Sequence, residues 1–118
     1  MDEFERWKRD CYPRYWIQKS PKYGLDSYCR GLIALMERGQ PKSGFDLGIG
    51  TGYPFAEKLL AAGLDVAGCD IAPELIAELN NIYPAVTAYV GGYEDLDQLK
   101  LAINQKFDLV YSLRSTWY

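Results

Sequence analysis

From residue 43 onward the chain alternates short apolar runs with segments of helical periodicity, and this alternation limits the possible folds more than any other feature. The runs with the length of strands are Gly44–Leu47, Asp65–Cys69, Val86–Val90 and Phe107–Leu113. Between them lie the helix candidates Pro54–Ala62, Pro73–Ile82 and Glu94–Asn104. A helix between two strands makes a crossover connection, and crossovers join parallel strands. The sequence therefore predicts an α/β fold, a Rossmann-like three-layer sandwich with a parallel sheet between helices.

The first 43 residues lack this alternation and differ in composition. Phe4, Trp7 and Cys11 share one face of a short opening helix, and a turn-rich aromatic segment follows. A longer helix is predicted over Leu25–Arg38, with its apolar face formed by Tyr28, Leu32, Leu35 and Met36. We therefore expect a helical and aromatic cap segment over residues 1–43 and the Rossmann-like part over residues 44–118.

A glycine-rich stretch, G-F-D-L-G-I-G-T-G-Y-P-F, begins with the first predicted strand and continues past its end. Its glycines stand at every second position, as Gly48, Gly50 and Gly52. Open parallel sheets bind ligands beyond the carboxyl ends of their strands, where this stretch lies. Glycines allow the backbone to turn sharply, to approach a ligand closely and to enter a helix N-terminus. A plain strand-to-helix turn is the alternative, but one glycine would suffice for it.

Two phosphate-binding motifs do not fit this stretch. The dinucleotide motif G-x-G-x-x-G requires a third glycine where the chain has Tyr53 or Phe55. The phosphate loop G-x-x-x-x-G-K-[ST] requires a lysine that does not follow a suitable glycine here. The spacing therefore disfavours nicotinamide dinucleotides and nucleoside triphosphates.

An acid followed by G-x-G-x-G at the end of a first strand resembles the cofactor motif of the class I methyltransferases that use S-adenosylmethionine. In this chain the motif consists of Asp46, Gly48, Gly50, Thr51 and Gly52. The resemblance implies that the loop wraps the methionine portion of the cofactor. It also implies that Asp46 supports the loop or meets the ammonium group.

The second mark of this resemblance is an acid that ends the second strand, in G-C-D-I-A-P-E-L-I. The resemblance implies that Asp70 binds the ribose hydroxyls and that Ile71 packs on adenine. Asp70 could instead be a plain cap of the following helix, a position where aspartate is common. Cys69 is interpreted as a small buried residue beside the site and not as a nucleophile.

The third and fourth marks follow the third and fourth predicted strands. In G-G-Y-E-D-L, Gly92 stands where many family members have an acid for the adenine amine, so Tyr93 or Glu94 is left to compensate. Glu94 and Asp95 could equally be a helix-start pair that stabilises the helix dipole. The stretch F-D-L-V-Y-S-L-R-S-T-W-Y resembles the fourth strand and the loop that faces the methyl group, which makes Ser112 a further candidate for cofactor binding.

The function implied by the resemblance is methyl transfer from S-adenosylmethionine to a small-molecule acceptor by direct displacement. The chain has no histidine, which excludes Ser-His-Asp and Cys-His catalysis within it and leaves the catalytic residues unassigned. Two alternatives stay open. One is a catalytically silent Rossmann-like module that serves association or regulation, and the weaker one is a nicotinamide-binding half-domain.

The family's sheet has seven strands, whereas this chain supplies about four. A truncated chain, a naturally short protein and a chain completed by a partner would each explain the difference. The fourth strand, Phe107–Leu113, would then present a free apolar edge. We therefore expect a homodimer or a partner chain to pair with this edge.

Composition limits the remaining classes of function. A net charge of −3 disfavours nucleic-acid binding, which requires a basic face. No apolar run approaches the roughly 18 residues of a membrane span, and the charged N-terminus does not resemble a secretory signal. Cys11, Cys29 and Cys69 are too widely spaced for a zinc site or a disulfide framework, so no metal is expected. We therefore expect a cytoplasmic protein that binds neither nucleic acid nor membrane.

Overall fold

The computed structural model describes residues 2–3, 6 and 26–112. The predicted opening helix around Phe4, Trp7 and Cys11 lies outside the described residues, as does the aromatic segment that follows it. Residues 113–118 are also outside them. The fold described below is therefore that of residues 26–112.

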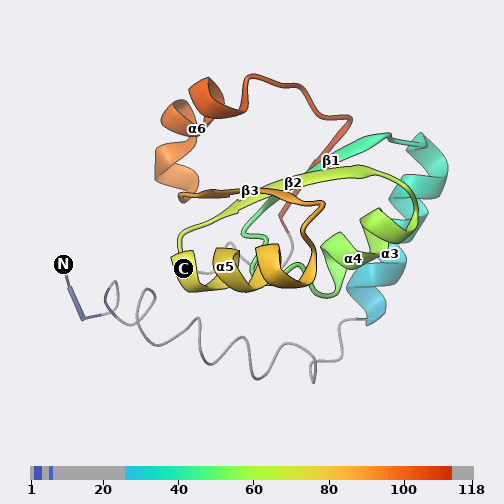
Figure 1. Cartoon of the computed structure of the whole chain (residues 1–118). Coiled ribbons are helices and arrows are strands. Elements are labelled where there is room, and N and C mark those ends of the chain that lie inside the picture. The colour runs from blue at the N-terminus through green and yellow to red at the C-terminus, as the bar shows by residue number, and fades with distance from the viewer. Residues whose placement is uncertain (1, 4–5, 7–25, 113–118) are drawn as a thin grey trace.

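A parallel sheet of four strands forms the centre of the fold (Figure 1), in the order β3-β2-β1-β4. The strands are β1 (Ser43–Leu47), β2 (Asp65–Asp70), β3 (Thr87–Val90) and β4 (Leu109–Tyr111). The chain builds outward from β1 through β2 to β3 and then returns to add β4 on the other side of β1. The predicted α/β class and parallel sheet are confirmed, and the strand order reverses beside β1.

The strand register brings the carboxyl ends to one edge of the sheet. Asp46 near the end of β1 pairs with Gly68 of β2 and with Tyr111 of β4. Asp70 at the end of β2 pairs with Val90 at the end of β3. The loops that follow the strands therefore meet at this edge, where ligands of such sheets bind.

The helices begin and end at residues suited to those positions. They are α3 (Asp26–Gly39), α4 (Phe55–Ala61), α5 (Pro73–Ile82), a short 3-10 helix η2 (Tyr93–Asp95) and α6 (Leu96–Ile103). Pro73 occupies the first turn of α5, where a missing N–H does no harm. Gly63, with φ of 86°, follows α4, and Asn104, with φ of 42°, ends α6 in the left-handed region.

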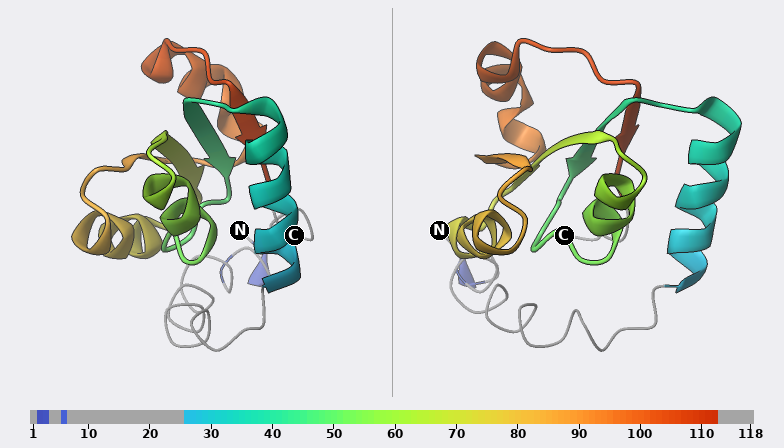
Figure 2. Two further views of the ribbon diagram at one scale, coloured as in Figure 1. Left: turned by 90° about the vertical axis from the view of Figure 1, so that its right-hand side faces the viewer. Right: turned by 45° about the vertical axis from the view of Figure 1, so that its right-hand side comes forward.

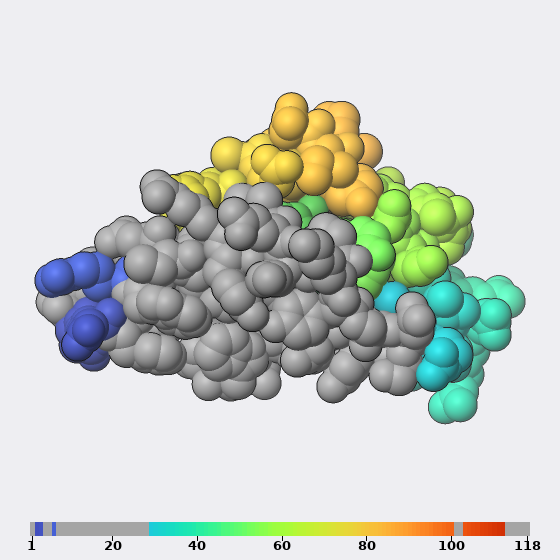
Figure 3. Space-filling model, turned by 90° about the horizontal axis from the view of Figure 1, so that it is seen from below, coloured from blue at the N-terminus to red at the C-terminus, as the bar shows by residue number. Residues whose placement is uncertain are grey.

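The helices cover both faces of the sheet (Figure 2), which gives the predicted three layers. The helices α3, α4 and α5 share one face (Figures 1 and 3), and their core continues onto the sheet through Val66 and Tyr111. On the other face, Leu99 of α6 packs in a smaller cluster with Phe45 of β1. Successive residues of a strand point to opposite faces of the sheet. Phe45 packs in the smaller cluster, so Asp46 points toward the larger core, as does Tyr111, its partner in register on β4.

The predicted ends of most strands and helices differ from the structure by at most one residue, but three details differ more. The fourth strand is limited to Leu109–Tyr111, because Phe107 lies before it and packs its ring 5.1 Å from that of Phe45. The last helix begins at Leu96 instead of residue 94, because the 3-10 turn η2 precedes it.

The third difference is in α3, where Leu35 does not belong to the buried face. Cys29, Leu32 and Met36 pack into the larger core, but the side chain of Leu35 is 53% exposed. The buried face is therefore narrower than the apolar spacing predicts. No described helix combines the length and the apolar character needed to cross a membrane.

Candidate functional site

The glycine loop after β1 requires glycine at each of its three alternate positions. The φ angles of Gly48, Gly50 and Gly52 are 86°, 59° and 84°, in the left-handed region where other residues are strained. The N–H groups of Gly48 and Ile49 both donate to the carbonyl of Cys69 at 2.9 Å. The loop therefore folds across the end of β2, and a single-glycine turn would not suffice.

Asp70 holds this loop from the end of β2. Its Oδ2 accepts the N–H of Gly50 at 3.0 Å, and its Oδ1 accepts the N–H of Ala72 at 3.1 Å. Burial raises the pKa of Asp70, while the backbone N–H donors lower it. Asp70 is not the plain cap of α5, because the N-cap residue is Ala72 and the helix has no side-chain cap bond; Asp70 binds instead the N–H of Ala72, just before the helix. The bond to Gly50 adds a second role, because it joins the loop after β1 to the loop after β2.

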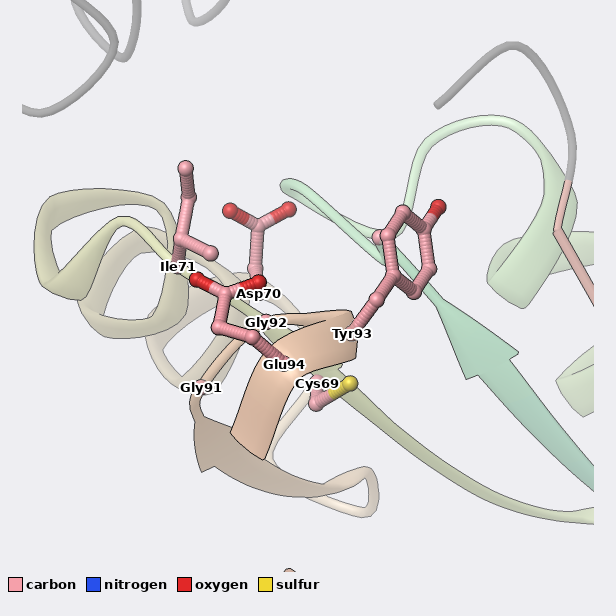
Figure 4. A pocket seen from close by; sticks show the side chains of 8 residues that line it. Cys69, Asp70, Ile71, Gly91, Gly92, Tyr93 and Glu94 are labelled. Carbon is pink, nitrogen blue, oxygen red and sulfur yellow. The ribbon is translucent and has the colours of Figure 1, made fainter. Parts of the chain in front are cut away.

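A pocket opens where the loops after β1, β2 and β3 meet (Figure 4), with about 380 Å³ of empty space including its mouth. Its lining consists of Gly48, Cys69, Asp70, Ile71, Gly91, Gly92, Tyr93 and Glu94. Gly48, Asp70, Ile71, Tyr93 and Glu94 were predicted site residues, and the structure brings these five together. Gly91 is a lining residue that the motifs did not single out.

Cys69 lies at the inner side of the pocket and is 1% exposed. Burial raises the pKa of its thiol to about 11, so the thiol stays protonated at neutral pH. The thiolate is the nucleophilic form of cysteine. The structure thus confirms a small buried residue beside the site.

The other predicted site residues lie around the pocket without lining it. They are Asp46, Gly50, Thr51, Gly52 and Ser112. Gly52 faces α5, because a Cβ there would lie 2.7 Å from Leu79 Cδ1 and 3.1 Å from Tyr83 Cδ2. Close packing of the loop on α5 is therefore a structural reason for the third glycine.

Asp46 and Tyr111 form a buried polar pair on neighbouring strands. Asp46 is 3% exposed, and burial raises its pKa to about 8, with the Tyr111 hydroxyl lowering it and the charge of Asp70 raising it further. The interaction is looser than an ordinary hydrogen bond, since the Tyr111 hydroxyl has no partner of normal geometry among the described residues. The motifs did not identify Tyr111, because its place beside Asp46 depends on strand register.

Thr51 adds a third polar group of this kind. Its side chain is 2% exposed, and its Oγ1 has no hydrogen-bond partner within the described part of the chain. Buried polar groups in proteins nearly always have partners, and each exception requires an explanation. Thr51 Oγ1 and Tyr111 Oη are therefore two buried hydroxyls, in and beside the glycine loop, that a polar ligand or water could satisfy.

A chain of hydroxyl groups joins the ends of β1 and β4 to η2. Ser112 Oγ donates to the carbonyl of Leu47 at 3.0 Å, and it lies 2.9 Å from the hydroxyl of Tyr93. A hydrogen bond to Ser112, which directly follows β4, therefore fixes Tyr93 over the carboxyl end of the sheet. Both residues are predicted to bind cofactor, and the structure shows that they bond to each other.

Comparison of the sequence with protein-family models gives no match. Comparison with the curated proteins also gives no match. Among the described residues, no group of three or more histidine, cysteine, aspartate or glutamate side chains could hold a metal ion. The fold is thus an incomplete Rossmann-like α/β sheet with a pocket at its carboxyl edge, and the function has to be argued from that pocket.

Proposed function

We propose that this chain is a methyltransferase that binds S-adenosylmethionine, or the cofactor-binding part of one. The observation that carries the proposal is the hydrogen bond from the N–H of Gly50 to Oδ2 of Asp70, at 3.0 Å. It joins a loop of left-handed glycines after β1 to the acid at the end of β2, beside one pocket. Glycines and an acid in these two places are the marks on which the family resemblance depends.

The amino-acid end of S-adenosylmethionine carries an ammonium and a carboxylate, and it requires polar partners. The buried hydroxyls of Thr51 and Tyr111 fit this requirement, because neither has a hydrogen-bond partner among the described residues. An ammonium would stabilise the charged form of Asp46, which burial disfavours. This end of the cofactor would therefore lie along the glycine loop.

The adenosine end requires a hydroxyl acceptor and an apolar surface. Asp70 and Ile71 are adjacent in the pocket lining and supply these two features. Each oxygen of the Asp70 carboxylate accepts one backbone N–H and retains a further lone pair. Asp70 could therefore bind ribose hydroxyls while it still holds the loop.

The cofactor, when bound, supplies an activated methyl group on its sulfonium. The chain's own residues would bind and orient the cofactor and exclude water around it, which is the main task in direct displacement. The acceptor is proposed to be a small molecule, and no general base is assigned. Cys69 is a buried free thiol, which supports a reducing, cytoplasmic setting.

One observation favours a second candidate, a catalytically silent module. Both oxygens of Asp70 already accept backbone hydrogen bonds in the chain itself, so the residue has a structural use that requires no ligand. In that case the loop would be kept for folding, and the fold would serve association or regulation. Ligand binding separates the two candidates.

Isothermal titration with S-adenosylhomocysteine tests the proposal. We expect saturable binding to the wild-type chain and a loss of affinity in Asp70→Ala, because that change removes both the loop tie and the ribose acceptor. Asp65→Ala is the matched control, since Asp65 begins the same strand at the opposite edge and is exposed. Circular dichroism and thermal unfolding establish that each variant is folded.

The outcomes distinguish the candidates. Binding that Asp70→Ala abolishes and Asp65→Ala retains supports the S-adenosylmethionine site. A folded wild-type chain that does not bind S-adenosylhomocysteine favours the silent module. Binding of NAD in a parallel titration, without binding of S-adenosylhomocysteine, would instead favour a nicotinamide half-domain.

A further inference from the structure

The strand β3 is the outer strand of the sheet at the edge opposite β4, and a groove lies at its carboxyl end. Among the described residues β3 pairs with β2 alone, so no neighbouring strand covers its outer side. An unpaired strand edge is a template for another extended segment. The groove at the end of β3 has about 970 Å³ of empty space, its open mouth included. The strand edge and the groove together therefore offer a site for an extended chain.

One part of this groove, called the β3 groove below, is apolar. Val90 ends β3 with 53% of its side chain exposed, and Ile71, Pro73 and Leu99 complete the apolar lining. Pro73 belongs to α5 and Leu99 to α6, which lie on opposite faces of the sheet beside this edge (Figure 1). Successive side chains of an extended segment point to opposite sides. A strand bound here would therefore place alternate side chains against the apolar lining.

The charged part of the β3 groove is acidic. Glu94 and Asp95 of η2 line it, and no described lysine or arginine does. Asp97 adds a further acid in the first turn of α6, whereas Lys100 lies in the last turn of that helix. Complementary charge decides which partners a surface accepts and which it repels. The β3 groove therefore favours a basic segment and disfavours an acidic one.

The same charge disfavours a second copy of this chain as the occupant. The strand that a second copy would offer in a symmetric pair is β3 itself, whose sequence T-A-Y-V contains no basic residue. The chain as a whole has a net charge of −3. A basic segment of another protein matches the acidic lining better than a second copy does.

We propose that the β3 groove binds an extended basic peptide segment of a partner protein, which adds a strand to β3 and places basic side chains beside Glu94 and Asp95. In strand addition of this kind, main-chain hydrogen bonds give affinity and alternate side chains give specificity. The interaction does not require S-adenosylmethionine, so it is tested separately from the proposed function. Ile71, Gly91 and Glu94 line both the β3 groove and the cofactor pocket, so the test variants are placed at other residues.

Fluorescence anisotropy with labelled hexapeptides tests the proposal. The basic probes alternate lysine with valine, leucine or tyrosine, and each acidic counterpart has glutamate in place of lysine. We expect saturable binding of at least one basic probe and binding of its acidic counterpart that is weaker by about tenfold or more. A basic probe with methyl groups on all its peptide nitrogens should not bind, because it has no N–H to donate to the edge of β3.

Val90→Lys is the variant that tests the place of binding. It should weaken the basic probe by about tenfold or more, because it adds a like charge to the groove and because a lysine on an edge strand hinders pairing. Ile82→Lys is the matched control, since it adds the same charge at an apolar position of α5 that is 48% exposed and outside the groove lining. It should keep the wild-type affinity, and circular dichroism establishes that both variants are folded.

Four results would overturn the proposal. They are a folded wild-type chain that binds no basic probe, equal affinity for basic and acidic probes, undiminished binding of the N-methylated probe, and equal weakening by Val90→Lys and Ile82→Lys. Light scattering on the same proteins tests the competing occupant. A wild-type dimer that Val90→Lys converts to a monomer would identify a second copy at β3 and would also overturn the proposal.

Discussion

At the scale of single residues, Asp46 has a carboxyl whose buried environment disfavours its charged form. Its carboxyl is 3% exposed, and burial raises its pKa to about 8. The nearest stabilising group, the Tyr111 hydroxyl, gives it no ordinary hydrogen bond. Folding therefore favours the protonated form of Asp46 over much of the neutral range.

This environment predicts a pH dependence of stability. The unfolded chain releases the Asp46 proton near pH 4, whereas the folded chain holds it to about pH 8. Between these values the folded state binds the additional proton, so this residue makes the free energy of unfolding fall as pH rises. Asp46→Asn should therefore be more stable than the wild type at about pH 9, by an amount on the order of 2–5 kcal/mol.

Urea unfolding of the two proteins at several pH values measures this difference. It should shrink as pH falls toward about 4, where Asp46 is protonated in both states. Asp65→Asn changes an exposed aspartate and should give a curve close to that of the wild type. Wild-type and Asp46→Asn curves that stay parallel from acid to alkaline pH would contradict the prediction.

Among the elements, the short strand β4 is held by side-chain hydrogen bonds of the adjacent Ser112 as well as by its backbone pairing with β1. Ser112 directly follows β4, donates to Leu47 at the end of β1 and bonds to Tyr93 of η2. Three elements thus share one chain of hydrogen bonds at the carboxyl edge. This arrangement fixes the position of η2, which supplies Tyr93 and Glu94 to the pocket.

A double-mutant cycle on Tyr93→Phe and Ser112→Ala tests this connection. Each single change should lower the free energy of unfolding by about 0.5–1.5 kcal/mol, the usual net value of a hydrogen bond. The double variant should lose less than the sum, because either change alone breaks the bond between the two hydroxyls. Chemical unfolding measures all four proteins, and strictly additive losses would show that the two residues do not interact.

Local signals in the sequence were sufficient to predict most elements. Pro73 and the apolar spacing after it predicted α5 with its correct bounds, since both signals act within the helix itself. The start of α6 was placed too early, because acids at positions 94 and 95 also suit a 3-10 turn. Leu35 has the spacing of a core residue, but whether it is buried depends on how α3 packs against the rest of the fold.

The sequence predicted those residues of the candidate site that stand at fixed positions in the motifs. Asp70 and Gly50 were both predicted site residues, but the hydrogen bond between them depends on how two loops approach in space. The pairing of Asp46 with Tyr111 depends on strand register, which no local pattern encodes. Motifs thus identified the residues, and tertiary structure determined their contacts.

At the scale of the whole molecule, the described part of the sheet is open beside β4. Among the described residues β4 pairs with β1 alone, and the side chain of Val110 is 58% exposed. Val110 shares a sheet face with its neighbour in register Phe45, but α6 does not cover it as it covers β1. An exposed apolar edge strand of this kind is a site of association.

We therefore predict that the chain self-associates through β4, with two copies of the strand paired antiparallel across a two-fold axis. Size-exclusion chromatography with light scattering should give about twice the mass of one chain at high concentration. Val110→Lys should restore the monomer, because a lysine on an edge strand blocks pairing. Ile82→Lys is the control, since Ile82 is 48% exposed on α5 and away from this edge. A wild-type monomer at every concentration would contradict the prediction.

The central claim concerns the whole carboxyl edge of the sheet: the loops after β1, β2 and β3 form one site for S-adenosylmethionine. Amide ¹H–¹⁵N spectra during titration with S-adenosylhomocysteine test it most directly, because they report every loop at once. The account predicts the largest shifts at Gly50, Ile71 and Glu94, with little change at Lys42 and Asp65 on the opposite edge. Unchanged spectra, or shifts confined to the opposite edge, would contradict it.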